Sequence, residues 1–192
     1  GKIKVGEEAQ IYPEGIVTKI KSVQIDDAPS EDALAGQRVA LNLSDVKVSQ
    51  ISRGDVVSFP DALLSVTGVY ARLELLEDAP FPVKHRQRVR FHVVTKETLG
   101  RVHIMEGDVI MPSGKGYFYI ALEEPVVCSY KDKFILRSYS PVTTLGGGEV
   151  IYPNTVKLKR QNEGTGVKVL ERAFFGGLSE AIEGLVSTFG PK

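Results

Sequence analysis

The chain is almost free of cysteine and has no tryptophan: Cys128 is the one thiol among 192 residues. A single thiol cannot form an internal disulfide, so the fold must rely on packing, as is usual in a reducing compartment. Cys128 lies within the apolar run PVVCSY, where we expect a small buried hydrophobic side chain and not a reactive thiol. The sequence therefore excludes the class of small secreted proteins held together by disulfides.

Long apolar runs are also absent. No stretch approaches the ~20 consecutive apolar residues that a membrane-spanning helix needs. The first residues, GKIKVGEEAQ, do not have the pattern of a signal peptide. Hydrophobic residues make up 42% of the chain and charged residues 25%, which is an ordinary balance for a soluble domain. We therefore predict a soluble protein of one or two domains, with no membrane partner.

The residues of metal and catalytic sites are few. The three histidines, His85, His92 and His103, do not have the spacing of metal ligands relative to the cysteine or to a carboxylate cluster. The G-x-S-x-G turn that presents the nucleophile of many hydrolases is missing, although a Ser-His-Asp triad assembled from distant positions stays an open alternative. We predict that this chain is not an enzyme and holds neither a metal ion nor a cofactor.

Three consecutive glycines, Gly146–Gly148, would suit a phosphate-binding loop because glycine lets a ligand or another backbone come close. Such a loop requires Lys and then Ser or Thr directly after the glycines, followed by a helix. Here Glu149, Val150 and Ile151 follow, which is typical of a strand. We interpret the glycines as a tight corner at the entry of a strand.

Short β-prone segments separated by Gly, Pro, Asn or Asp dominate the chain up to about residue 156. This spacing is typical of antiparallel barrels or sandwiches, and the strands are too many for one small barrel. We predict a mainly β fold of two consecutive antiparallel β-barrels, divided near residues 60–67. The predicted strands are residues 8–12, 16–25, 37–43, 55–59, 68–76, 86–94, 100–105, 108–110, 117–122, 126–129, 132–138 and 149–152.

The C-terminal part has a different character. Residues 158–166 read as a polar linker, and residues 167–175 as a first short helix that ends at Gly176 and Gly177. Apolar side chains then recur over residues 178–189 with the period of an amphipathic helix. We predict a short α-helical segment after the barrels. The predicted domains are residues 1–62, 63–156 and 157–192.

Charge is spread unevenly although the net charge is zero. Residues 1–80 carry 8 Lys and Arg against 13 Asp and Glu, whereas residues 81–160 carry 13 against 7. Within the basic part, strand alternation over residues 84–96 would give one face to cations and the other to a core. Guanidinium groups match phosphate oxygens, so this face predicts a phosphate contact. The alternative is a solvated face paired with acids such as Glu106 or Asp108. The outer residues would be Arg86, Arg88, Arg90 and His92, and the inner residues Gln87, Val89, Phe91 and Val93.

The string RSYSPVTTLGGG, residues 137–148, resembles the end of the third domain in selenocysteine-specific translation elongation factors, the SelB type. Residues 33–43, ALAGQRVALNL, resemble part of the second domain of elongation factor Tu and its relatives, and ISRGDVV, residues 51–57, resembles the strand that closes that domain. The matching residues of the first string are Arg137, Tyr139, Ser140, Pro141, Val142, Thr143, Thr144 and Leu145–Gly148.

This resemblance implies two barrels of the elongation-factor type followed by the start of a winged-helix extension. In that family the second domain begins two strands before Gly1, so the first barrel is expected to be truncated at its N-terminus and the chain to be a fragment. The parent protein would be a cytoplasmic GTPase that uses GTP and Mg²⁺ in an upstream GTPase domain. The implied partners are selenocysteinyl-tRNA, the ribosome and that GTPase domain.

The resemblance also implies where aminoacyl-tRNA binds. In elongation factor Tu the second domain holds the aminoacylated 3′ end, and the position matching Arg38 is an asparagine that faces the amino acid. SelB-type factors carry arginine there, and a fixed cation would favour the ionised selenol of selenocysteinyl-tRNA over seryl-tRNA. Otherwise Arg38 is a surface residue at a strand start. Gln24 and Asp26 match the strand lining this pocket, where Gln24 would contact the terminal adenosine and Asp26 is equally explained as a turn residue.

The third domain of elongation factors contacts the acceptor and T arms of tRNA from the region of Arg86, Arg88 and Arg90. We therefore predict the aminoacyl-tRNA-binding portion of a GTP-dependent elongation factor for selenocysteine. One alternative is the barrel pair of another translational GTPase, for example an initiation factor subunit. Another is an interaction module without an RNA role.

Overall fold

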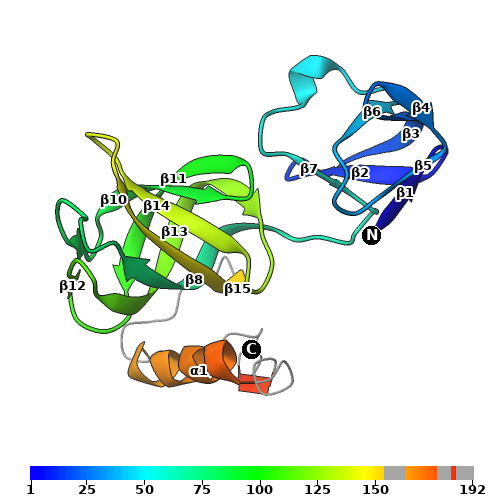
Figure 1. Ribbon diagram of the computed structural model, residues 1–192. Coiled ribbons are helices and arrows are strands. Elements are labelled where there is room, and N and C mark those ends of the chain that lie inside the picture. The colour runs from blue at the N-terminus through cyan, green and yellow to red at the C-terminus, as the bar shows by residue number, and fades with distance from the viewer. Residues whose placement is uncertain (154–162, 177–182, 185–192) are drawn as a thin grey trace. The chain divides into compact units, whose positions relative to one another are not determined.

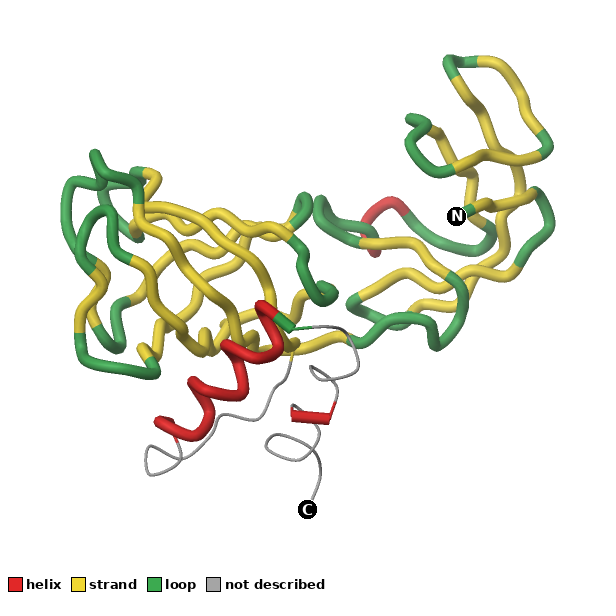
Figure 2. The backbone as a smooth tube through the Cα atoms, turned by 60° about the horizontal axis from the view of Figure 1, so that its bottom comes forward, coloured by secondary structure: helices red, strands yellow, loops and turns green. Residues whose placement is uncertain are grey.

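The computed structural model describes residues 1–153, 163–176 and 183–184 (Figure 1). The chain forms two compact units, Gly1–Leu64 and Ser65–Lys192. Strands dominate both units, as the tube view in Figure 2 shows. The mainly β fold predicted from the sequence is confirmed.

The first unit is built from short strands around a small core. Strands β2, β3, β4 and β7 form one sheet in the order β4-β3-β2-β7, with β6 also paired to β3, while β1 pairs with β5. The buried cluster consists of Ala9, Ile20, Val23 and Ala33, and partly buried side chains pack against it. The elements are β1 (Lys2–Lys4), β2 (Glu8–Tyr12), β3 (Ile16–Ile25), β4 (Ala28–Ser30), β5 (Asp32–Leu34), β6 (Val39–Leu43), the 3-10 turn η1 (Val48–Gln50) and β7 (Val56–Ser58).

The second unit contains a closed barrel with the strand order β10-β11-β13-β8-β15-β14. Alternating apolar side chains from all six strands fill its interior, among them the fully buried Phe91, Phe118 and Leu136. A two-stranded sheet of β9 and β12 accompanies it. The strands are β8 (Ser65–Leu75), β9 (Val83–Lys84), β10 (Arg88–Val93), β11 (Lys96–Ile104), β12 (Val109–Ile110), β13 (Lys115–Val127), β14 (Lys133–Ser138) and β15 (Thr144–Pro153).

Two features of the predicted strand pattern are wrong. The segments predicted at 117–122 and 126–129 belong largely to one strand, β13, whose pairing with β8 is irregular between Ala121 and Val126. A bulge of this kind looks like a turn in the sequence because it interrupts the apolar alternation. Strands β1, β4, β5 and β9, each of two or three residues, were not predicted.

The glycine run lies inside a strand, so the tight corner predicted for it is wrong. Gly146, Gly147 and Gly148 belong to β15 and pair with β8 on one side and β14 on the other. A Cβ atom on Gly147 would lie 2.6 Å from the carbonyl oxygen of Phe134. Cβ atoms on Gly146 and Gly148 would overlap the backbone of β8. The glycines therefore allow close approach of neighbouring strands, as glycine in a strand often does.

Helix α1 (Glu163–Phe175) packs on the outside of the second barrel (Figure 1). Its buried side chains Val167, Leu170 and Ala173 form a cluster with barrel residues that include Tyr70 and Tyr119. Near the end of the helix, the hydroxyl of Tyr130 donates to the carbonyl of Ala173 at 2.6 Å.

The helical segment differs from the sequence prediction at its start. Residues 163–166 are helical, although they were predicted as part of a polar linker. Tertiary packing of the following turns against the barrel outweighs the poor helix propensity of the two glycines in EGTG. Most of the amphipathic helix predicted at 178–189 lies outside the described residues.

Candidate functional site

The first unit carries the three predicted pocket residues at one end of the β3–β6 pair. In the antiparallel pairing of β3 and β6, Gln24 lies opposite Ala40. Arg38 directly precedes β6, and Asp26 directly follows β3 in the turn. Both therefore adjoin the last pair of these strands, Ile25 and Val39. The side chains of Gln24, Asp26 and Arg38 are exposed, so all three are available at this end of the β3–β6 pair.

A hydrogen-bonded turn positions Arg38. The side-chain oxygen of Gln37 accepts a hydrogen bond from the backbone N–H of Leu34 at 2.7 Å. Gly36 in the same turn has φ +88°, a conformation that favours glycine. Within the described part of the chain, the side chain of Arg38 makes no hydrogen bond or ion pair. Its guanidinium therefore has its donors available for a ligand.

Asp26 has a structural explanation of its own. Asp26 and Asp27 form the two-residue connection between β3 and β4, with φ of 49° and 64°. Positive φ at both central residues is typical of type I′ hairpin turns, which Asp tolerates better than most residues. The turn accounts for both aspartates, so a contact between Asp26 and tRNA stays a prediction.

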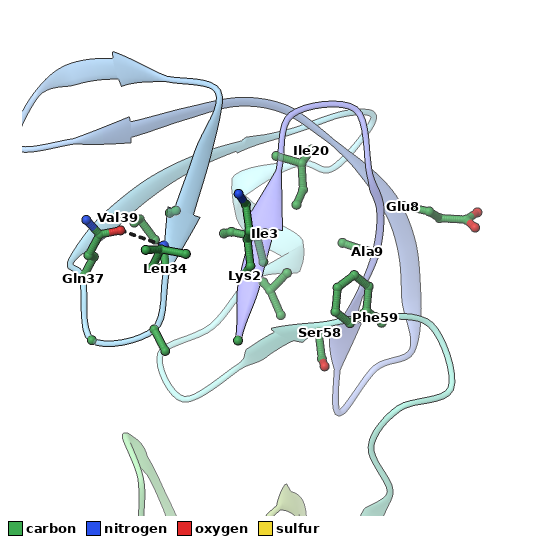
Figure 3. A pocket seen from close by; sticks show the side chains of 15 residues that line it. Lys2, Ile3, Glu8, Ala9, Ile20, Leu34, Gln37, Val39, Ser58 and Phe59 are labelled. Atoms are coloured by element: carbon green, nitrogen blue, oxygen red, sulfur yellow. Dashed lines mark hydrogen bonds between the residues drawn. The ribbon is translucent and has the colours of Figure 1, made fainter.

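An apolar pocket of about 320 Å³ opens in the first unit, and Gln37 and Val39, the sequence neighbours of Arg38, belong to its lining (Figure 3). Ile3, Ile20 and Val39 contribute to its wall, and Phe59 stands at its edge with 51% of its surface exposed. Arg38 and Gln24 are not among its lining residues. The pocket has no signal in the sequence, because its wall combines residues from six strands that are far apart in the chain.

In the second unit, β10 has the predicted alternation. Val89, Phe91 and Val93 are buried in the barrel, and Arg88 and Arg90 lie on the outer face, half-buried.

Arg86 does not continue this row of arginines, because it lies in the turn before β10 with φ 65°. Its backbone N–H donates to the carbonyl of Val102 at 2.7 Å. The three predicted arginines are therefore near one another in sequence but do not form a single row on the strand.

Two glutamates hold the arginines of β10. Arg88 donates from Nε and Nη2 to the two carboxylate oxygens of Glu123, at 2.7 and 2.6 Å. Arg90 pairs with Glu97 at 2.5 Å. The hydrogen bond from Arg90 lowers the pKa of Glu97, and the hydrogen bond from Arg88 lowers the pKa of Glu123. The alternative of a face paired with acids of neighbouring strands therefore holds for Arg88 and Arg90, with Glu123 of β13 and Glu97 of β11 as the partners in place of Glu106 and Asp108.

Tyr139 lies beside both arginines. Its ring centre is 4.6 Å from Cζ of Arg88 and 5.8 Å from Cζ of Arg90, within the range of cation–π contacts. Buried Ser138 shapes the loop that carries this tyrosine, since its Oγ accepts the N–H of Thr143 at 2.9 Å. The resemblance of residues 137–148 to a family string assigned no role to Tyr139.

Two further arginines share this outer face. Strand pairing sets Arg137 opposite Arg90 and Arg101 opposite Arg88. The Nε atom of Arg137 is buried and finds no hydrogen-bond partner in the part of the chain that the structure describes. We name the outer face that contains Arg88, Arg90, Arg101, Arg137 and Tyr139 the arginine surface. Arg101 and Arg137 were not predicted as part of this surface, because the pattern of one strand does not show which strands pair with it.

The remaining candidates have little chemistry. Burial raises the pKa of the Cys128 thiol to about 12, so the thiol is protonated and unreactive at neutral pH. No group of three or more His, Cys, Asp or Glu side chains suited to a metal ion occurs among the described residues. No helix in those residues is long and apolar enough to cross a membrane.

Two family models match the chain. Residues 1–58 match elongation factor Tu domain 2, and residues 69–157 match the beta-barrel domain of selenocysteine-specific elongation factors.

Proteins with known names are also similar to it. A selenocysteine-specific elongation factor of Desulfomicrobium baculatum is 31% identical over 163 residues, which are 85% of this chain and 26% of that protein. One from Methanocaldococcus jannaschii is 28% identical over 200 residues, covering 94% of this chain and 43% of that protein.

The fold agrees with these similarities. The crystal structure of a bacterial selenocysteine-specific elongation factor, EF-Sec, superposes with a TM-score of 0.73 at 21% identity, over 96% of this chain and 28% of that one. The chain thus spans about a quarter to under a half of the length of these relatives. With an elongation factor Tu domain 2 and a SelB β-barrel domain side by side in its sequence, the chain belongs to the SelB-type family of selenocysteine-specific elongation factors.

Proposed function

We propose that this chain is the aminoacyl-tRNA-binding portion of a GTP-dependent factor that delivers selenocysteinyl-tRNA to the ribosome in the cytoplasm. The observation that carries the proposal is the exposed end of the β3–β6 pair in the first unit, where Arg38 and Gln24 lie without competing partners in the described residues. Binding and hydrolysis of GTP with Mg²⁺ would belong to a GTPase domain of the parent protein. From this chain we expect no GTPase activity.

Arg38 would select the amino acid by charge. A selenol is ionised at neutral pH, whereas the hydroxyl of serine is not, so an arginine beside the side chain would favour the selenolate. The exposed guanidinium of Arg38 can approach such an anion without first breaking an ion pair. Selection would therefore come from the difference between two affinities.

Gln24 would contact the terminal adenosine of the tRNA. Its amide offers both donors and an acceptor, which suits the edge of a base. The pairing of Gln24 opposite Ala40 leaves a small side chain beside the amide, so that face is open to a ligand. Asp26 would line the same region from the turn after β3.

The arginine surface, with Arg86 beside it, would hold the phosphate backbone of the tRNA. Residues 81–160 carry a surplus of six positive charges, and neutralisation of phosphates by such cations supplies much of the affinity of proteins for nucleic acids. Contacts of this kind position the RNA without reading its sequence.

The selectivity proposal can be tested by replacing Arg38 with Ala in the parent factor. We expect binding of selenocysteinyl-tRNA to weaken by about tenfold, the loss of one charge-assisted hydrogen bond, with little change for seryl-tRNA. Arg53→Ala removes another exposed arginine of the first unit and serves as the control. Equal losses for the two tRNAs would refute selection by Arg38. Binding that is absent, or insensitive to salt, would favour an interaction module without an RNA role.

A further inference from the structure

We propose that Glu97 and Glu123 limit the affinity of the arginine surface for RNA, because they occupy the anion-binding sides of Arg90 and Arg88 and are displaced by phosphates on binding. This inference rests on the proposed RNA-binding function. It assigns the two glutamates a role that the arginines alone do not suggest. The ligand group is a phosphodiester of an RNA backbone.

The geometry of the Arg88 pair supports competition. Glu123 accepts from Nε and Nη2 with its two oxygens, at 2.7 and 2.6 Å. This fork-to-fork arrangement is the one in which an arginine also binds two oxygens of a phosphate. A phosphate cannot use the same two donors while the carboxylate holds them. Glu97 occupies a single donor of Arg90, Nη1, so its competition with a phosphate is limited to that donor.

Both carboxylates are exposed enough to be displaced from their arginines. The side chains of Glu123 and Glu97 are 43% and 45% exposed, so water can solvate them once they are displaced. Exposed ion pairs contribute little net stability, which makes their exchange for another anion inexpensive. Neither glutamate belongs to the barrel core. Displacement is therefore compatible with an intact fold.

The arginines keep their positions when the carboxylates leave. The ring of Tyr139 contacts both guanidinium groups, and Nε of Arg90 also donates to the Tyr139 carbonyl at 3.4 Å. Because Ser138 fixes the loop of Tyr139 through Thr143, this support does not depend on the glutamates. The arginines would remain oriented toward an incoming phosphate.

The charge balance predicts that removing the glutamates strengthens RNA binding. The arginine surface presents four arginines, and two glutamates neutralise half of that charge. The nearby Arg137 and Arg101 form no ion pair with a carboxylate of the described residues and would attract the backbone first. Removing the glutamate charges would leave all four cations to the phosphate backbone.

The experiment compares the wild-type chain with Glu97→Gln/Glu123→Gln. Binding to a short RNA duplex with the sequence of a tRNA acceptor stem is measured by fluorescence anisotropy over a series of salt concentrations. We expect the double variant to bind roughly two- to fivefold more tightly near 0.1 M salt. The slope of log K against log salt should become steeper by about one to two. Glu74→Gln, which removes a carboxylate paired with Lys115 at 3.1 Å, is the matched control.

The outcomes separate the two proposals. If the wild type binds in a manner that depends on Arg88 and Arg90 but the double variant binds no more tightly than Glu74→Gln, the glutamates do not compete and the inference fails. If replacing Arg88 and Arg90 leaves wild-type binding unchanged, the arginine surface itself is refuted. Competition by inorganic phosphate at millimolar concentration would show a site for the free ion and also overturn the inference, which requires a polymeric backbone.

Discussion

The two units of this chain present their cations in different ways. Arg38 stands alone on a unit whose buried cluster has four residues, and among the described residues nothing pairs with its side chain. Arg88 and Arg90 lie on a closed barrel with 21 residues in its core cluster, and each is held by a carboxylate and a tyrosine. An unpaired cation suits a single anionic group, whereas an ordered and partly neutralised row suits a repeating polyanion.

The two units also require glycine for different reasons. In the second unit Gly148 is needed because β15 approaches β8 too closely for any side chain, while in the first unit Gly36 is needed for its positive φ in open space. The first demand comes from packing and the second from backbone conformation. Substitutions at these two positions therefore probe how rigid each unit is.

The largest effect is expected from Gly148→Ala. Its Cβ would overlap the carbonyl oxygen of Arg72 in β8, so the barrel must open locally, at a cost of about 3 kcal/mol. Gly36→Ala adds no contact and should cost about 1 kcal/mol through its positive φ. Urea unfolding followed by circular dichroism would measure both. Similar costs at the two positions would contradict the view that the second unit is the more tightly packed.

The next effect concerns the arginines and salt. Replacing Arg86, Arg88 and Arg90 with Ala should weaken RNA binding by about tenfold or more, and the salt slope should fall by about one to three. Arg38→Ala should change the slope by no more than about one, because a single group is involved. Anisotropy titrations at several salt concentrations would distinguish the two, with Lys133→Ala as the control. An unchanged slope in the triple variant would mean that these arginines are structural.

A smaller effect is expected at Ser138. Ser138→Ala leaves the N–H of Thr143 without its acceptor and the carbonyl of Pro141 without its donor, and the loss of these hydrogen bonds from a buried serine should cost about 1 to 2 kcal/mol. The loop of Tyr139 would loosen, so RNA binding should weaken slightly. Amide hydrogen exchange at Thr143 would report the change, and exposed Ser140→Ala is the control. Unchanged exchange would show that the loop is held by other contacts.

Strand pattern made most of the fold predictable. The strand predicted at residues 16–25 coincides with β3, because alternation over ten residues is easily recognised. The glycine run was placed at a corner, because no local signal shows that two neighbouring strands would touch a Cβ there. The close approach depends on how β15 packs between β8 and β14, and the sequence of β15 alone does not show it.

For the candidate site, the sequence predicts which face of a strand a side chain occupies but not which side chains of other strands lie beside it. Alternation placed Arg88 and Arg90 on the outer face of β10, as the structure shows. Their carboxylate partners come from β11 and β13, and the pairing of those strands depends on the closure of the barrel. The contacts of Tyr139 could not be predicted, because it lies in a loop and the alternation of side chains applies only within strands.

The smallest effect should appear on acidification. The pKa values of Glu97 and Glu123 are lowered in the folded chain by their arginines, so these ion pairs stabilise the second unit above the unfolded pKa of about 4.3 and are lost as pH falls through the folded values. Glu97→Gln/Glu123→Gln should therefore unfold with a weaker pH dependence below pH ~4, while stability near pH 7 changes little because the pairs are exposed. Thermal unfolding between about pH 3 and pH 7 checks this. Arg38 has no such ion pair, so Arg38→Ala should not change how the stability of the first unit depends on pH below pH ~4. If the wild type and the double variant lose stability equally as pH falls, carboxylates other than Glu97 and Glu123 cause the loss.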